Sequence, residues 1–257
     1  MGNINATTTS IIGNPDETII EQLVKSIDTS HTEKIKLHFD DAANRFDNFI
    51  QTLIPNYNNM IEILTAIIPF DEHDDFEVID LGCGTGTISY FINKKFSHAK
   101  ITCMDISEKM LQIAADKIVA DVSCISGDLN TFTFPQKYDV IVSSLALHHL
   151  ETDQAKFEMY QRIYAGLKEN GIFINLDIVL GSNEELQAIN MQNWINFMKQ
   201  NVSEREIVEK WIPSYYADDR PTSLRSHIKF LEEAGFKEVD VIYKAFNYSV
   251  FCGRKRI

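Results

Sequence analysis

The stretch Val78-Ile79-Asp80-Leu81-Gly82-Cys83-Gly84-Thr85-Gly86 decides the fold, because it joins a short apolar run to a glycine-rich loop. A buried strand that ends in such a loop and is followed by a helix is typical of a βαβ unit. Gly82 and Gly84 allow positive φ and let backbone N–H groups approach a ligand closely. We therefore expect a ligand-binding turn here.

From Phe76 to about Ile178 the chain alternates short apolar runs with amphipathic helices. This alternation predicts an α/β fold with a mostly parallel sheet. Beyond it, two further strands are expected to pair antiparallel. The predicted strands are Glu77–Leu81, Lys100–Met104, Val122–Ser126, Tyr138–Val142, Ile172–Leu176, Glu238–Tyr243 and Tyr248–Cys252.

Helical segments flank this core on both sides. Residues 1–72 show apolar residues at helical spacing and predict an N-terminal lid or cap, with helices near 19–27, 34–51 and 57–68. Residues 73–257 form the main domain. A helical insertion at about 181–221 interrupts its alternation and is expected to be a second cap.

Composition narrows the class of protein. With 44% hydrophobic and 24% charged residues among 257, the chain can bury a large core. A net charge of −13 disfavours a nucleic-acid partner. No stretch approaches the ~20 apolar residues of a membrane span, and no secretory signal is recognised. Cys83, Cys103, Cys124 and Cys252 lack metal-ligand spacing, so we expect no metal and a reducing, cytoplasmic location.

An acidic residue after the next strand supports the prediction that the glycine loop binds a ligand. Asp105 ends the next strand about twenty residues on, where a carboxylate can accept both ribose hydroxyls of an adenosine. A dinucleotide-binding loop needs its third glycine where Thr87 stands. The third glycine is Gly86 instead, and this spacing suits a ligand without a pyrophosphate. The alternative for Asp105 is a cap of the helix after Ser107.

Several segments, in order and at the expected spacing, resemble class I S-adenosylmethionine-dependent methyltransferases. The resemblance covers about residues 75–178 and implies a doubly wound, Rossmann-like sheet of seven strands that binds S-adenosylmethionine. It also implies an enzyme that moves a methyl group to a small-molecule acceptor by in-line displacement. Besides the glycine loop, the segments are Met104–Leu111, Ser126–Leu129, Tyr138–Leu150 and Gly166–Phe173.

The resemblance assigns roles to individual residues. Asp80 would lie near the amino group of the methionine moiety and Asp105 would hold the ribose. Ile106 and Leu129 would enclose the adenine, with Asp128 on its amino group. The predicted cofactor-binding residues are Asp80, Gly82, Cys83, Gly84, Gly86, Asp105, Ile106, Met110, Gly127, Asp128, Leu129 and Ser144.

Some of these residues have an ordinary structural alternative. Asp128 would then be a turn residue, Met110 a core residue and Cys83 a small loop residue.

His148 and His149 are the predicted catalytic residues, because they follow the fourth strand where it opens toward the site. An amine, alcohol or acid acceptor can require a base, and histidine serves near neutral pH. The alternative is that the pair lines the cofactor cleft or caps the next helix.

The acceptor pocket is expected to come from the two helical caps. Phe39-Asp40 and Phe46-Asp47 resemble the family's N-terminal lid segment, although the family usually has Tyr where Phe46 stands. Aromatic rings near a sulfonium are cation–π candidates, and ordinary packing is their alternative. The predicted substrate-binding residues are Phe46, Tyr57, Asp177, Trp194 and Tyr216.

Other functions stay open at this point. One is S-adenosylmethionine chemistry without methyl transfer, such as cyclisation or carboxyl transfer to the methyl group. Another is a non-catalytic cofactor-binding subunit. An NAD-dependent oxidoreductase is opposed by Thr87 and by the missing second nucleotide-binding half. The acceptor atom is open, and both a monomer and a homodimer are compatible with the lack of a heptad pattern.

Overall fold

The computed structural model describes residues 30–42, 46–118 and 121–256. The helix expected near 19–27 lies outside these ranges. The elements in chain order are α2 (His31–Ala42), α3 (Phe46–Leu53), α4 (Tyr57–Ala66), β1 (Glu77–Leu81), α5 (Thr87–Lys95), β2 (Lys100–Asp105), α6 (Glu108–Lys117), β3 (Ser123–Ser126), β4 (Tyr138–Ser144), η2 (Leu147–His149), α7 (Asp153–Gly166), β5 (Leu167–Leu180), α8 (Glu184–Met198), α9 (Glu204–Glu206), η3 (Ile207–Trp211), α10 (Ile212–Asp218), β6 (Thr222–Ser223), α11 (Leu224–Ala234), β7 (Lys237–Ala245) and β8 (Tyr248–Arg254).

The strands form one sheet in the order β3-β2-β1-β4-β5-β8-β7, and the two-residue β6 pairs with β5. The first five strands in this order are parallel, whereas β8 runs antiparallel to both β5 and β7. The predicted α/β class and mostly parallel sheet are therefore confirmed. The additional strand is β6.

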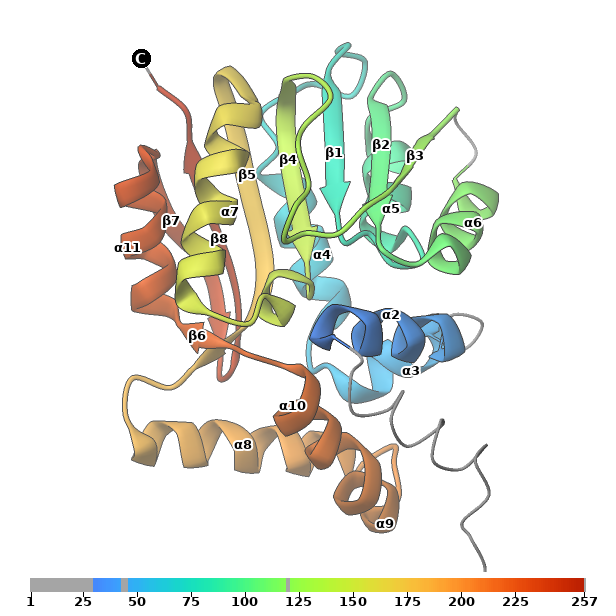
Figure 1. Cartoon of the computed structure of the whole chain (residues 1–257), viewed down its shortest axis with the longest axis vertical. Coiled ribbons are helices and arrows are strands. Elements are labelled where there is room, and N and C mark those ends of the chain that lie inside the picture. Colours follow the sequence, from blue (N-terminus) through green and yellow to red (C-terminus); the bar gives the residue numbers. More distant parts are fainter. Residues whose placement is uncertain (1–29, 43–45, 119–120, 257) are drawn as a thin grey trace, which may run out of the picture.

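Helices cover both faces of the sheet (Figure 1). The side chains of a strand alternate between faces, so Val78 joins the core beneath α4, α5 and α6, while Ile79 joins the core beneath α7 and α11. Near-continuous burial along β1 follows from this double cover.

The caps gather at one edge of this sheet. The strand order reverses between β1 and β4, and ligands of open α/β sheets bind outside the carboxyl ends of the strands at such a point. Helices α2 and α3 lie at this edge, and α8, α9 and α10 of the insertion lie beyond them (Figure 1). In contrast, α4 packs on the sheet itself through the fully buried Met60, Ile61 and Leu64.

The fifth strand differs most from expectation. We predict a helix over about Gln154–Leu167 that Asn170-Gly171 ends, and α7 does end at Gly166, but β5 begins at once with Leu167. Leu167 is fully buried and pairs with Tyr138, so pairing with β4 starts the strand before the expected Ile172. Asn170 does adopt a left-handed conformation (φ 63°), but within β5. Over the described ranges, no helix has the length and apolarity needed to cross a membrane.

Candidate functional site

The glycine loop turns sharply between β1 and α5. Gly82, Gly84 and Gly86 all have positive φ, at 65°, 53° and 74°. A Cβ added at Gly84 would meet no protein atom within 4 Å, so the backbone at this position borders open space. The loop thus exposes main-chain groups to a ligand, as its sequence predicts.

Asp105 fixes the loop against the end of β2. One carboxylate oxygen accepts a hydrogen bond from the Gly84 N–H at 2.8 Å, and the other accepts one from the Ser107 N–H at 2.9 Å. Burial raises the pKa of this carboxyl, although these backbone donors oppose the rise. Each carboxylate oxygen can accept a second hydrogen bond, so Asp105 can act both as a brace and as a ligand group.

A hollow of about 890 Å³, including its open mouth, lies next to this loop, and we call it the cofactor pocket. Its size lies within the range of small-molecule sites. Nine predicted cofactor residues, as well as Tyr57 and His149, line it. The nine are Gly82, Cys83, Gly84, Asp105, Ile106, Gly127, Asp128, Leu129 and Ser144.

Three predicted cofactor residues lie behind the wall of the pocket instead. Asp80 is buried and accepts a hydrogen bond from the Ser89 hydroxyl at 2.8 Å. Gly86 is the left-handed N-cap of α5, and Met110 is a fully buried core residue. None of the three lines the cofactor pocket.

Asp128 combines the two interpretations considered for it. Its Oδ1 accepts hydrogen bonds from the backbone and side-chain nitrogens of Asn130, at 2.8 and 2.9 Å, which closes a tight turn. The same residue lines the cofactor pocket. A turn residue at the end of β3 therefore still presents a carboxylate to the pocket.

Sequence reasoning places Phe39-Asp40 in a lid segment but names no residue of α2 as cofactor-binding. Ile35 and Phe39 of this helix line the cofactor pocket, and so does Thr32. Ile35 and Phe39 are four residues apart and share one helix face, which is a signal that the sequence does contain. Asp40 holds the helix in place by accepting a 2.5 Å hydrogen bond from the Ser107 hydroxyl.

A second hollow of about 800 Å³, including its mouth, adjoins the first, and we call it the acceptor pocket. Ile35, Phe39, Leu145 and His149 line both pockets. Most of the remaining wall comes from α3 and the insertion. These residues are Ile50, Leu53, Ile54, Trp194, Trp211, Ser214, Tyr215, Asp218 and Asp219, with His38, His148, Ile178 and Tyr248.

The predicted substrate-binding residues lie in different parts of the structure. Trp194 lines the acceptor pocket and Tyr57 the cofactor pocket. Tyr216 is 67% exposed and lines neither, because it faces away from the insertion's packed side. Asp177 is fully buried in β5 and also lines neither. The side chain of Phe46 lies outside the described part of the chain.

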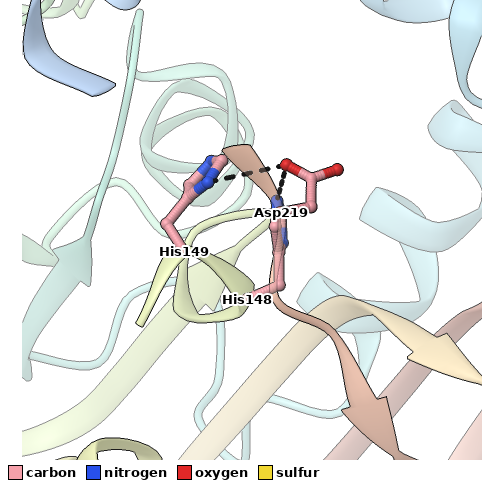
Figure 2. A group of neighbouring side chains, drawn as sticks. All are labelled: His148, His149 and Asp219. Carbon is pink, nitrogen blue, oxygen red and sulfur yellow. Dashed lines mark ion pairs between the residues drawn. The ribbon is translucent and has the colours of Figure 1, made fainter. Parts of the chain in front are cut away.

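His148 and His149 lie in η2, where they meet Asp219 from the end of the insertion (Figure 2). His148 Nδ1 is 2.5 Å from Asp177 Oδ1. Burial lowers the pKa of His148, but the Asp177 and Asp219 carboxylates outweigh it and raise the pKa to about 10. Burial and the charge of His148 lower the pKa of His149 to about 3. At neutral pH, His148 is therefore charged and His149 neutral.

Asp219 carries no sequence signal. It is separated from the histidine pair by β5 and the whole insertion, and no motif surrounds it.

Residues 78–171 match a family described as "Methyltransferase domain". Over this range the chain is similar to methyltransferases. This confirms the predicted resemblance and the fold of S-adenosylmethionine-binding enzymes. A "carboxy-S-adenosyl-L-methionine synthase" of Nautilia profundicola is 26% identical over 84% of this chain and 93% of its own length.

Solved structures agree on the fold. A putative methyltransferase of Haloferax volcanii, solved with the Trm112 methyltransferase activator, has a TM-score of 0.62 at 17% identity and covers 85% of this chain and 98% of its own. Human N-acetylserotonin methyltransferase with S-adenosylmethionine has a TM-score of 0.53 at 18% identity, covering 92% and 60%.

Proposed function

We propose that this protein transfers a methyl group from S-adenosylmethionine in the cofactor pocket to a small molecule in the acceptor pocket. The observation that carries the proposal is that the two pockets meet at a shared wall of Ile35, Phe39, Leu145 and His149. In-line displacement requires the acceptor atom and the sulfonium carbon to be aligned in a site that excludes water. Adjoining, largely apolar pockets provide this arrangement.

The residues that line the cofactor pocket favour one orientation of S-adenosylmethionine. Ile106 and Leu129 offer apolar surfaces for the adenine, and Asp105 and Asp128 offer acceptors for the ribose and the adenine amino group. The glycine backbone then receives the methionine end, beside Leu145 and the acceptor pocket. The sulfonium would thus face the acceptor.

The acceptor pocket favours a small aromatic or apolar molecule with one polar group. Trp194, Trp211 and Tyr215 supply ring surfaces, and the polar groups gather at His149 and Asp219. His149 is neutral at physiological pH and can accept a hydrogen bond from a hydroxyl or amine acceptor. His148, charged and held by Asp177, would position this group electrostatically. Because a pKa of about 3 makes His149 a weak base, it is our candidate for orienting the acceptor.

Carboxyl transfer to the S-adenosylmethionine methyl group is the second candidate, because a relative covering most of this chain is named for that product. A carboxyl donor is an anion. The described residues that line the acceptor pocket include Asp218, Asp219 and the charged His148 but no Lys or Arg, so their net charge is negative. This charge balance supports methyl transfer over carboxyl transfer from an anionic donor.

The first test is calorimetric titration of the protein with S-adenosylmethionine and S-adenosylhomocysteine. Removal of a charged hydrogen-bonding group costs roughly 1.5–3 kcal/mol, so Asp105→Ala should weaken binding about 10- to 100-fold. Asp116→Ala, which removes an exposed carboxylate from α6, is the matched control and should bind like wild type. Equal affinities in both variants would contradict the assigned pocket.

Mass spectrometry of the reaction products then separates the two candidate functions. An acceptor that gains a methyl group, together with S-adenosylhomocysteine, supports methyl transfer. A nucleoside product that gains a carboxyl group supports the second candidate instead.

A further inference from the structure

His148, His149 and Asp219 each point one possible metal ligand atom toward a common centre. Figure 2 shows the Asp219 carboxylate facing both imidazole rings. Asp219 Oδ1 is 3.4 Å from His148 Nε2 and 3.6 Å from His149 Nδ1. One ligand atom from each of the three residues lies within 4.8 Å of the others.

The two separations from Asp219 Oδ1 are close to those between neighbouring ligands of one metal ion. Hydrogen bonds between nitrogen and oxygen are about 2.7–3.2 Å long, so both contacts of Asp219 Oδ1 are too long. Metal–ligand bonds of about 2.0–2.2 Å place neighbouring ligand atoms roughly 3.0–3.5 Å apart. We propose that His148, His149 and Asp219 bind one divalent transition-metal ion.

Asp177 provides an independent argument, because it holds His148 in the orientation that a metal ligand requires. Its fully buried carboxylate contacts His148 Nδ1, so Nε2 is the nitrogen directed at Asp219. The backbone N–H of Ile178 and the amide of Asn175 fix the carboxylate in turn, at 2.9 and 3.3 Å. A carboxylate behind a ligating histidine is the usual outer partner in metal sites.

The residue types indicate the class of metal. Two imidazoles and one carboxylate suit Zn²⁺, Fe²⁺ and similar ions, whereas Mg²⁺ and Ca²⁺ prefer oxygen ligands alone. Three protein ligands leave open positions for water or substrate. To bind the ion, His148 has to release the proton that its Nε2 carries at neutral pH, because only a neutral imidazole is a metal ligand. His149 Nδ1 also has to give up its 3.3 Å contact with the Asp218 carbonyl.

The metal site would add a role to the proposed methyl transfer, and this part of the inference rests on that proposed function. All three residues line the acceptor pocket, and His149 also lines the cofactor pocket. An ion here would bind an oxygen or nitrogen atom of the acceptor close to the sulfonium and lower the pKa of that group. It would also offset the negative charge of Asp218 and Asp219. With the ion bound, His149 is a ligand of the ion and no longer accepts a hydrogen bond from the acceptor.

Titration with Co²⁺ tests the site, because its visible absorption reports the ligands and their geometry. The full-length protein is first treated with a chelator and dialysed. We expect one Co²⁺ per chain with intensified visible bands, and displacement by Zn²⁺ but not by Mg²⁺. Unchanged absorption of Co²⁺ in the presence of wild-type protein would overturn the proposal.

Asp219→Asn should weaken Co²⁺ binding at least about tenfold, since it removes a charged ligand. Asp218→Asn is the matched control, because this neighbouring carboxylate pairs with His38 at 3.6 Å instead. Equal weakening in both variants would show only a general effect of local charge and would refute the assigned ligands. Circular dichroism verifies that each variant is folded.

Asp177→Asn examines the positioning role of the outer carboxylate. It should weaken Co²⁺ binding roughly 10- to 100-fold and shift the visible bands of the remaining complex, which a merely structural role would not do. S-adenosylmethionine titrations without metal are run in parallel. Cofactor binding without Co²⁺ binding would refute the metal site alone, whereas loss of both would point to a failure of the proposed function.

Discussion

Asp80 shows how one buried carboxyl shapes the pH dependence of this protein. Burial raises its pKa to about 7, and the hydrogen bond from Ser89 only partly opposes the rise. Its Oδ1 has no hydrogen-bond partner among the described residues. The folded state therefore binds this proton more tightly than the unfolded state. Its contribution to stability is complete below the unfolded pKa and is lost as the pH rises toward 7.

We predict that Asp80→Asn increases the free energy of unfolding at pH 8 by a few kcal/mol, on the order of 1.4 for each pKa unit, with little change at pH 4. Urea denaturation at both values measures the difference. Asp116→Asn, an exposed carboxylate, should leave the pH dependence of wild type intact. An Asp80→Asn protein with the wild-type slope would contradict the burial argument.

At the scale of single residues, the sequence predicts nine of the residues that line the cofactor pocket. Gly82, Gly84 and Asp105 belong to one continuous β1–α5–β2 unit, so their spacing alone places them together. Asp219 meets His149 only through the path of the insertion. No local pattern encodes that meeting, and it requires the tertiary structure.

Helix α3 is tied to the glycine loop through Asp47. This carboxylate accepts hydrogen bonds from the Thr85 hydroxyl at 2.5 Å and from Lys117 Nζ at 2.6 Å. Partial burial opposes ionisation, yet these partners lower the pKa of Asp47 overall. Helix α3 is thereby fastened to the glycine loop that borders the cofactor pocket.

We expect Asp47→Ala to weaken S-adenosylmethionine binding about 3- to 10-fold, because half-exposed ion pairs contribute up to about 1 kcal/mol. Calorimetry measures the affinity, and high salt should reduce the difference from wild type. Glu62→Ala on α4, also an exposed carboxylate, serves as the control. The prediction is wrong if both variants bind the cofactor equally.

At the scale of elements, apolar runs predict the strands within a few residues, since their burial is a local property of the sequence. β5 is the exception and spans 14 residues. Its extra length depends on pairing with β4 and β8. Partners distant in the chain therefore decide a boundary that local propensity places elsewhere.

For the whole molecule, Trp194 joins the two caps. Its indole N–H donates a buried 2.8 Å hydrogen bond to the carbonyl of Leu53, at the end of α3. The ring also packs against Tyr215, with ring centroids 5.5 Å apart. The insertion and the N-terminal helices are thus connected directly, although about 140 residues separate them.

Trp194→Phe keeps an aromatic ring but leaves the Leu53 carbonyl unsatisfied, which costs about 1–3 kcal/mol. We predict a lower melting temperature and weaker acceptor binding, with S-adenosylmethionine affinity nearly unchanged. Trp211→Phe is the matched control, because its N–H bonds Glu206 within the insertion. A larger loss of stability in the control would refute the connecting role of Trp194.

Helix α2 has a consequence for the order of events in turnover. Ile35 and Phe39 belong to the walls of both pockets, so one helix would contact both proposed ligands. Whichever ligand enters first fixes the helix position that the second one meets. The two affinities are then linked by one coupling free energy, which acts equally in both directions. Cofactor and acceptor would bind cooperatively, and release of the products would depend on movement of the same helix.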